Sequence, residues 1–296
     1  MFKGSLVALV TPFDTNNRVD YASLKGLIEF HVDNGTDGLV IAGTTGEAAT
    51  LTKSEHADLV FKAVELVDGR LPVIAGTGSN STQQTIDLSL EVAPSGIDAY
   101  LLVVPYYNKP VQEGIYRHFY AVADAVAKPI MLYNVPGRTV ADMQAQTVAR
   151  LASHENIFGI KEATGDINRL REIQAFVGSE FRCYSGDDFT ARSFLEAGGH
   201  GIVTVSGNVV PAAVSTLCRL VRDGQIEEAR QLDEKLQPLN NALFAESNPI
   251  PVKWALNQMG LIPPGLRLPL TELAERYHEQ MRDAAAVAGI DMGRPE

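Results

Sequence analysis

Cysteine is scarce in this sequence. Two residues of 296, Cys183 and Cys218, stand far apart and form no CxxC pair. So few cysteines exclude the disulfide framework of small secreted domains, and they leave no thiolate set for a metal ion. We expect two buried thiols in a protein of the reducing cytoplasm.

Positive charge is also in short supply. The chain has 25 Lys and Arg residues against 36 Asp and Glu residues, a formal net charge of −11, and no basic stripe. Nucleic acid is therefore not an expected partner, because a phosphate backbone is bound by clustered cations. An acidic protein repels anions at long range, so a small-acid substrate would have to meet cations placed locally in its site.

Long hydrophobic runs, metal clusters and cofactor fingerprints are missing as well. The N-terminal MFKGSLVALVTPF is too short for a membrane span and lacks the features of a signal peptide, so we expect a strand there and no membrane partner. No His, Cys and carboxylate cluster has metal spacing. The nearest approach to a dinucleotide fingerprint, GTGSNS at 76–81, is better explained as a loop leading into a capped helix.

The chain does have a regular alternation of apolar strand-like runs and amphipathic helical segments. We expect strands at 5–10, 38–43, 71–76, 99–105, 129–134, 157–160, 181–186 and 200–205. Helices are expected at 21–34, 53–67 with Ser54 as N-cap, 80–93, 112–126, 142–152, roughly 167–177, roughly 188–197 and from roughly 209 onward.

Eight such repeats predict an α/β fold, a (β/α)8 TIM barrel. We assign the catalytic barrel to residues 1–224 and a C-terminal helical region, packed on the barrel, to residues 225–296. A doubly wound parallel sheet is the alternative fold, but its dinucleotide fingerprint is missing.

Reactive side chains gather at the C-terminal ends of the expected strands, where active sites of such barrels lie. Hydroxyls, phenols, one guanidinium and one amine should therefore share one face. They are Thr44 and Thr45 after the second strand, Tyr106 and Tyr107 after the fourth, Tyr133 and Arg138 at and after the fifth, and Lys161 at the end of the sixth.

Tyr133 and Lys161 form the most informative pair. They are 161 − 133 = 28 residues apart, which is one repeat, and so should sit at the same level on neighbouring strands about 4.8 Å apart. A free lysine amine is neutral in only about one molecule in 2,500 at pH 7. A nucleophilic Lys161 would need desolvation, supplied by an apolar barrel interior, or a neighbouring cation such as Arg138.

Each of these residues also has a purely structural explanation. Lys161 could be a solvated or ion-paired charge at a strand end, although Glu162 should point the other way. Tyr133 could be a tyrosine whose ring packs in the core and whose hydroxyl reaches solvent. Arg138 could form a surface ion pair, and the stretch GTTGE could be a turn with a helix cap.

Several stretches together resemble the pyruvate-dependent Schiff-base lyase and aldolase family, and within it the dihydrodipicolinate synthases. The resemblance spans nearly the whole chain and is carried by GTTGEAATL (43–51), VIAGTGSNST (73–82), PYYNKP (105–110), YNVPGRT (133–139), GIKEATGD (159–166), YSGDD (184–188) and ESNPIPVKWAL (246–256). It implies that Lys161 forms an imine with pyruvate. The derived enamine would condense with aspartate 4-semialdehyde to give 4-hydroxy-tetrahydrodipicolinate, the first committed step of lysine and diaminopimelate biosynthesis, with no cofactor.

The resemblance also implies roles for individual residues. Tyr133 would relay protons, hydrogen-bonded through Thr44 to Tyr107, which in the family reaches in from a neighbouring subunit. This implies a homo-oligomer, a tetramer built as a dimer of dimers.

Substrate binding is implied for four further positions. Thr45 would hold the pyruvate carboxylate, and Arg138 would grip the carboxylate of the semialdehyde with its planar guanidinium. Gly186 and Val203 would line the pocket. Val203 stands where the family often has isoleucine; valine is one methylene smaller and keeps an apolar, β-branched wall, so the change bears on pocket size and not on the chemistry.

Many family members are inhibited by lysine at a cleft between subunits. The matching positions here are Ala49, His56, Asn80, Gln84 and Tyr106. Lysine-sensitive members typically carry glutamate where this chain has Gln84, and often histidine where it has Lys53. Because a neutral amide does not attract an ammonium and Lys53 adds repulsion, we expect weak lysine feedback or none.

Two other functions remain open from the sequence. A related pyruvate aldolase could act on another aldehyde or sugar acid. A barrel that binds a keto acid without turnover, as a sensor or scaffold, need not keep the set Thr44, Tyr107, Tyr133 and Lys161.

Overall fold

The computed structural model describes residues 2–292, in which eight parallel strands form a closed barrel. The strands are β1 Gly4–Ala8, β2 Gly38–Ile41, β3 Val73–Gly76, β4 Ala99–Val103, β5 Ile130–Asn134, β6 Ile157–Glu162, β7 Arg182–Ser185 and β8 Gly201–Thr204. Each strand pairs with the next, and β8 pairs with β1. The predicted TIM barrel is confirmed.

The strands are apolar along most of their length because both of their faces are buried. Side chains on one face fill the barrel interior, among them Leu6, Val40 and Tyr184. Side chains on the other face pack under the surrounding helices in a second, larger cluster that includes Leu39 and Leu102. The interior is thus a packed core, and the reactive groups are confined to its end.

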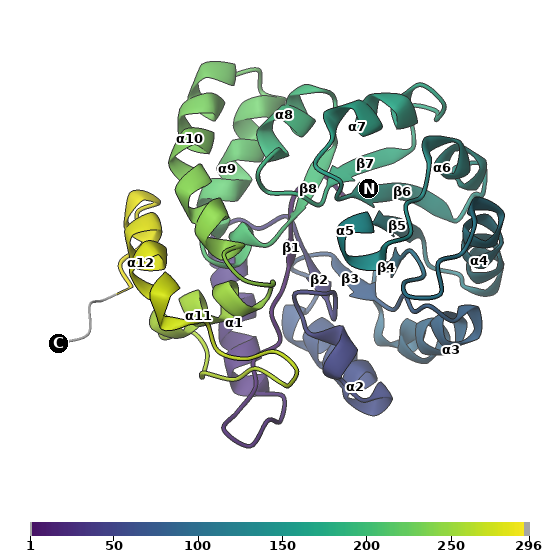
Figure 1. The fold of residues 1–296 in the computed structure, drawn as a ribbon. Helices are drawn as coiled ribbons and strands as arrows, with labels where there is room; N and C mark the ends of the chain where they lie inside the picture. Colours follow the sequence, from purple (N-terminus) through teal and green to yellow (C-terminus); the bar gives the residue numbers. More distant parts are fainter. Residues whose placement is uncertain (1, 293–296) are drawn as a thin grey trace.

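Helices surround the barrel in sequence order (Figure 1). They are α1 Tyr21–Asp33, α2 Lys53–Val67, α3 Thr82–Val92, α4 Gln112–Ala125, α6 Ala145–Leu151, α7 Ile167–Gln174, α8 Ala191–Glu196 and α9 Pro211–Arg222. A further short helix, α5 Pro136–Thr139, follows β5 and was not predicted; Pro136 occupies its first position, where a proline is well tolerated.

Two local predictions were wrong. Ser54 is not the N-cap of α2: Thr52 is, in a capping box with Glu55. The helix expected at 142–152, α6, begins at Ala145. Asp142 instead uses its carboxylate to bind Arg169 at 2.9 Å, which holds it outside the helix.

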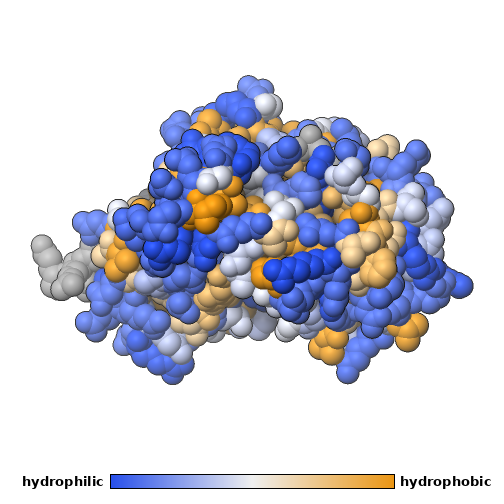
Figure 2. All heavy atoms as spheres, turned by 90° about the horizontal axis from the view of Figure 1, so that it is seen from above, coloured by the Kyte–Doolittle hydropathy of each residue, from blue (hydrophilic) through white to orange (hydrophobic). Residues whose placement is uncertain are grey.

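The C-terminal region consists of helices and contains no strand in its described part, 225–292. The helices α10 Ile226–Leu243, α11 Ile250–Gln258 and α12 His278–Val287 lie together at one side of the barrel, where α10 packs on α8 and α9 (Figure 1). The face drawn in Figure 2 is mainly hydrophilic, with apolar residues in small separate patches. No helix within residues 2–292 is long and apolar enough to cross a membrane.

Candidate active site

Lys161 and Tyr133 lie side by side at the end of the barrel. The register of β5 and β6 places them directly opposite each other, and the register of β7 places Tyr184 on the other side of Lys161. Lys161 Nζ is 4.2 Å from the centroid of the Tyr133 ring. Both residues are only 6% exposed, so Lys161 is a buried amine rather than a solvated charge.

The acidic neighbour of Lys161 is directed elsewhere. Glu162 accepts hydrogen bonds from Asn134 at 3.1 Å and from the backbone N–H of Thr164 at 2.8 Å, and burial raises the pKa of its carboxyl group. Across the described residues 2–292, no carboxylate pairs with the Lys161 ammonium. An amine without a paired charge is free to react.

Gly186 makes room for the Lys161 side chain. A Cβ atom at this position would lie 2.7 Å from Lys161 Cε and 2.7 Å from Ala163 Cβ. Any larger residue would therefore displace the amine. Val203 is 1% exposed and belongs to the same interior cluster as Tyr133 and Tyr184.

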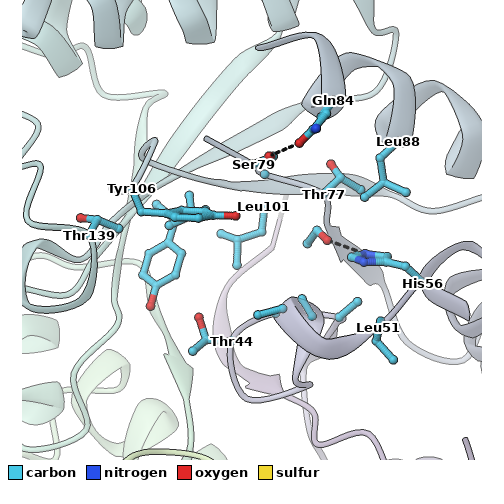
Figure 3. Close-up of a pocket in the computed structure, with 18 of the residues that line it drawn as sticks. Thr44, Leu51, His56, Thr77, Ser79, Gln84, Leu88, Leu101, Tyr106 and Thr139 are labelled. Atoms are coloured by element: carbon cyan, nitrogen blue, oxygen red, sulfur yellow. Dashed lines mark hydrogen bonds between the residues drawn. The ribbon is translucent and has the colours of Figure 1, made fainter. Parts of the chain in front are cut away.

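Thr44 and Thr45 follow β2 but face different surroundings. Thr44 is exposed and its hydroxyl points into the cavity drawn in Figure 3. Thr45 is 2% exposed, and its Oγ1 accepts a hydrogen bond from Asn248 Nδ2 at 3.0 Å.

A cavity of about 700 Å³ opens beside this group. Thr44, Tyr133 and Arg138 line it, whereas Thr45, Lys161, Gly186 and Val203 do not. Lys161 adjoins it through the ring of Tyr133. The structure therefore brings Lys161 together with Tyr133 and Gly186, and it places Tyr133 in the same cavity lining as Thr44 and Arg138.

Arg138 lies in α5 and lines this cavity. Its Nη2 donates to the carbonyl oxygen of Asn248 at 3.2 Å. It forms no ion pair with a carboxylate of the described chain, so its charge is available to an anion.

Tyr106 and Tyr107 are neighbours in the sequence but differ in their position relative to the cavity. Tyr106 is 40% exposed and lines the cavity (Figure 3), whereas Tyr107 is 89% exposed, has a backbone φ of 73° and does not line it. Within residues 2–292 no hydrogen bond joins Thr44, Tyr107 and Tyr133. The single chain thus leaves Tyr107 exposed and outside the lining of its own cavity.

Comparisons with known proteins identify the family of this chain. The model of the Dihydrodipicolinate synthetase family matches residues 1–288. This chain belongs to the dihydrodipicolinate synthetase family.

Relatives within the family match the chain from end to end. A protein of Pseudomonas syringae pv. syringae called 4-hydroxy-tetrahydrodipicolinate synthase is 53% identical over 98% of this chain and 99% of its own. Among solved structures, chloride-inhibited dihydrodipicolinate synthase from Acinetobacter baumannii, complexed with pyruvate, is 47% identical with a TM-score of 0.96, covering 98% of this chain and 100% of its own. The enzyme from Cyanidioschyzon merolae with lysine bound is 41% identical with a TM-score of 0.95, covering 97% and 98%.

The residues that match the family's lysine cleft lie largely in the same cavity. Ala49, His56, Gln84 and Tyr106 line it, but Asn80 does not. His56 Nε2 contacts the carbonyl oxygen of Gly76 at 2.8 Å, and burial lowers the pKa of its ring (Figure 3).

The sequence predicted that Lys53 would repel a lysine ammonium at this end of the cavity, but the structure gives Lys53 an acidic partner. Lys53 forms an ion pair with Glu91 at 2.8 Å, which offsets the repulsion that Lys53 would exert on an ammonium. Asp87 also lines the cavity. The Gln84 amide oxygen accepts a hydrogen bond from the Ser79 hydroxyl at 3.1 Å (Figure 3). Weak lysine binding is therefore expected from the uncharged Gln84 rather than from repulsion by Lys53.

Three residues near the site had no predicted role: Glu47, Asn248 and Lys253. All three are buried, at 3%, 6% and 3% exposure. Asn248 and Lys253 lie within ESNPIPVKWAL, and a lysine in the apolar run PVKWAL is the signal that could have indicated a buried, paired charge.

Proposed function

We propose that this chain condenses pyruvate with aspartate 4-semialdehyde through a Schiff base on Lys161, giving 4-hydroxy-tetrahydrodipicolinate. The observation that carries the proposal is the buried Lys161 amine, held against the Tyr133 ring without a carboxylate partner, in a chain of this family. A buried lysine without an ion pair destabilises a fold and is a candidate functional group.

The reaction proceeds by covalent catalysis. The Lys161 amine adds to the ketone carbon of pyruvate, and water leaves as the C=N bond forms. Loss of a methyl proton then gives an enamine, whose terminal carbon adds to the aldehyde carbon of the second substrate. The amino group of that substrate finally attacks the imine carbon, which closes the ring and releases Lys161.

Proton transfer falls to Tyr133, linked through Thr44 to Tyr107 of a neighbouring copy. A tyrosine in solution has a pKa near 10 and is a weak acid at pH 7, so sharing a proton along hydroxyl groups is a sensible arrangement. The 89% exposure of Tyr107 supports its use in another subunit's site. The active protein is accordingly a homo-oligomer, a tetramer arranged as two dimers.

Two anions are held at opposite parts of the site. Thr45 binds the pyruvate carboxylate beside Lys161, where Gly186 and Val203 shape the pocket. Arg138 binds the carboxylate of the semialdehyde at the mouth, where its lack of an ion pair supports this role.

The remaining assignments follow from this function. Residues 1–224 act as the catalytic barrel and 225–296 as a C-terminal region that supports it. The two cysteines are buried and unpaired, which supports a cytoplasmic location. Lysine inhibits weakly or not at all, because Gln84 replaces a charged partner for its ammonium; inhibition well below millimolar lysine would contradict this.

Trapping with borohydride tests the proposal. Borohydride reduces an imine to a stable secondary amine, so intact mass after incubation with pyruvate should show one adduct per chain, mapped to Lys161. No adduct, or adducts scattered over surface lysines, would contradict it. Activity of Arg138→Ala with aspartate 4-semialdehyde then tests the second substrate: a large loss is expected, whereas an unchanged rate would favour another aldehyde.

A further inference from the structure

The Thr44–Thr45 loop is held from the C-terminal region by the side chain of Asn248. Asn248 Nδ2 donates to Thr45 Oγ1 at 3.0 Å, and the two residues are 6% and 2% exposed. The partners are 203 residues apart in the chain. A buried hydrogen bond between such distant segments fixes one relative to the other.

The direction of this hydrogen bond has a chemical consequence. An amide nitrogen can only donate, so the Thr45 oxygen must accept and its own proton stays available for another acceptor. A carboxylate at that point would receive this proton in a charge-assisted hydrogen bond. Asn248 therefore presets the Thr45 hydroxyl as a donor.

The backbone of the same residue contacts Arg138. The Asn248 carbonyl oxygen accepts from Arg138 Nη2 at 3.2 Å. Asn248 thus touches both residues to which the proposed function assigns substrate carboxylates. The Asn248 Oδ1 atom is buried and has no hydrogen-bond partner in the described chain, which leaves the amide held through its nitrogen.

A buried ion pair makes a second link to the same loop. Lys253 Nζ lies 2.5 Å from Glu47 Oε1, with side chains 2% and 0% exposed, and also donates to the carbonyl oxygen of Thr11 at 2.9 Å. The Thr11 hydroxyl in turn donates to the Gly46 carbonyl oxygen at 2.7 Å. Residues 46 and 47, directly after Thr45, are therefore tied to α11 through charge and hydrogen bonds.

We propose that Asn248 and Lys253 are positioning residues through which the C-terminal region orders the Thr45 hydroxyl as a hydrogen-bond donor to the substrate carboxylate. The inference rests on the proposed function, because it assumes that Thr45 receives the pyruvate carboxylate. It gives the C-terminal region an indirect part in substrate binding, through the Thr45 loop, beyond its packing on the barrel.

Replacing Asn248 by its isostere tests the direction of the hydrogen bond. In Asn248→Asp the carboxylate can only accept, so the Thr45 proton turns toward it and a negative charge is added. Asn248→Ala removes the donor without reversing the bond. We expect the pyruvate concentration for half-maximal borohydride trapping on Lys161 to rise about tenfold or more in Asn248→Asp and less in Asn248→Ala.

The ion pair provides a second test that does not depend on Asn248. The double variant Glu47→Gln with Lys253→Met removes both charges and avoids leaving one of them unpaired. We expect its pyruvate requirement to rise about three- to tenfold while its thermal unfolding stays close to that of the unmodified chain. The matched control is Arg192→Met with Asp233→Asn, which breaks a link at 3.1 Å between α8 and α10 away from the loop and should leave the requirement unchanged.

The outcomes separate this inference from the proposed function. If the unmodified chain is trapped on Lys161 but Asn248→Asp and the Glu47/Lys253 double variant both keep its pyruvate requirement, the positioning role is wrong and the function stands. Equal rises in the test and control pairs would also overturn it, since any loss of anchoring would then have the same effect. Failure of the unmodified chain to form an adduct overturns the proposed function itself.

Discussion

Two buried lysines of this protein have opposite surroundings. Lys253 is 3% exposed and is satisfied by Glu47 at 2.5 Å and the Thr11 carbonyl oxygen at 2.9 Å. Lys161 is 6% exposed, and its Nζ has the face of the Tyr133 ring at 4.2 Å but no carboxylate partner in residues 2–292. Burial alone therefore does not separate Lys161, the proposed nucleophile, from the structural Lys253; the two lysines differ in their partners.

The cost of burying a charge explains the difference. Burial lowers the pKa of Lys253, and the Glu47 carboxylate opposes this effect. A paired ammonium is committed to its carboxylate and is a poor nucleophile. An unpaired one is retained at a cost in stability, which is typical of functional sites.

The largest effect is expected from Lys161→Met. Imine formation becomes impossible, so trapping with pyruvate should disappear and the rate should fall by at least about a thousandfold. Removing a buried unpaired amine should not lower the free energy of unfolding. Steady-state rates and thermal unfolding check this, and a variant that keeps its activity would contradict the nucleophile assignment.

The second largest effect, on stability, is expected from Lys253→Met alone. It leaves the Glu47 carboxylate buried without its cation, which should lower the free energy of unfolding by about 3–5 kcal/mol. Denaturant unfolding of Lys253→Met and of Lys161→Met under the same conditions compares the free energies of unfolding of the two variants. Equal stability of the two variants would show that the partners do not matter.

A smaller effect is expected from Gly186→Ala. This substitution tests how far the position of the Lys161 side chain depends on the space left by Gly186. The added methyl group would meet Lys161 Cε at 2.7 Å, and overpacking of this kind costs about 1–3 kcal/mol. Slower trapping with little change in secondary structure is expected by mass spectrometry and circular dichroism. Gly137→Ala is a matched control, since a Cβ there meets nothing within 4 Å.

The smallest effect is expected on stability in acid, at the ion pair between Arg267 and Glu55. This pair adjoins the buried Glu47–Lys253 pair, because the backbone N–H of Arg267 donates to Glu47 Oε2 at 3.1 Å. The Arg267 guanidinium, which reaches Glu55 at 2.6 Å, holds the pKa of that carboxyl at about 2, below its usual 4.5. A depressed folded-state pKa stabilises the protein above pH 4.5, and that stabilisation is lost as pH falls toward 2. Because Glu55 is partly exposed, Glu55→Gln should reduce the difference in the free energy of unfolding between pH 7 and pH 3 by less than about 1 kcal/mol. Denaturant unfolding at the two pH values measures this difference.

Much of the architecture was predictable because it depends on periodicity. The eight strands appear where apolar runs were expected, and β5 and β6 confirm the register that the 28-residue spacing of Tyr133 and Lys161 predicted. GTGSNS leads into α3 with Ser81 as N-cap, as expected for a loop and capped helix. The N-cap of α2 was misplaced because Thr52, Ser54 and their neighbours offer several equivalent hydroxyls, and only the capping box selects one.

The sequence by itself determined the barrel, the end of the barrel that holds the reactive groups, and the family, because strand period, helix period and local motifs are properties of neighbouring residues. Only the tertiary structure decided which of the buried groups are paired. Glu47 with Lys253 and Thr45 with Asn248 are separated by 206 and 203 residues, and no local pattern records such contacts. The energy of an ion pair or a hydrogen bond depends on the distance between its atoms in space, and only folding brings the atoms of these two pairs together.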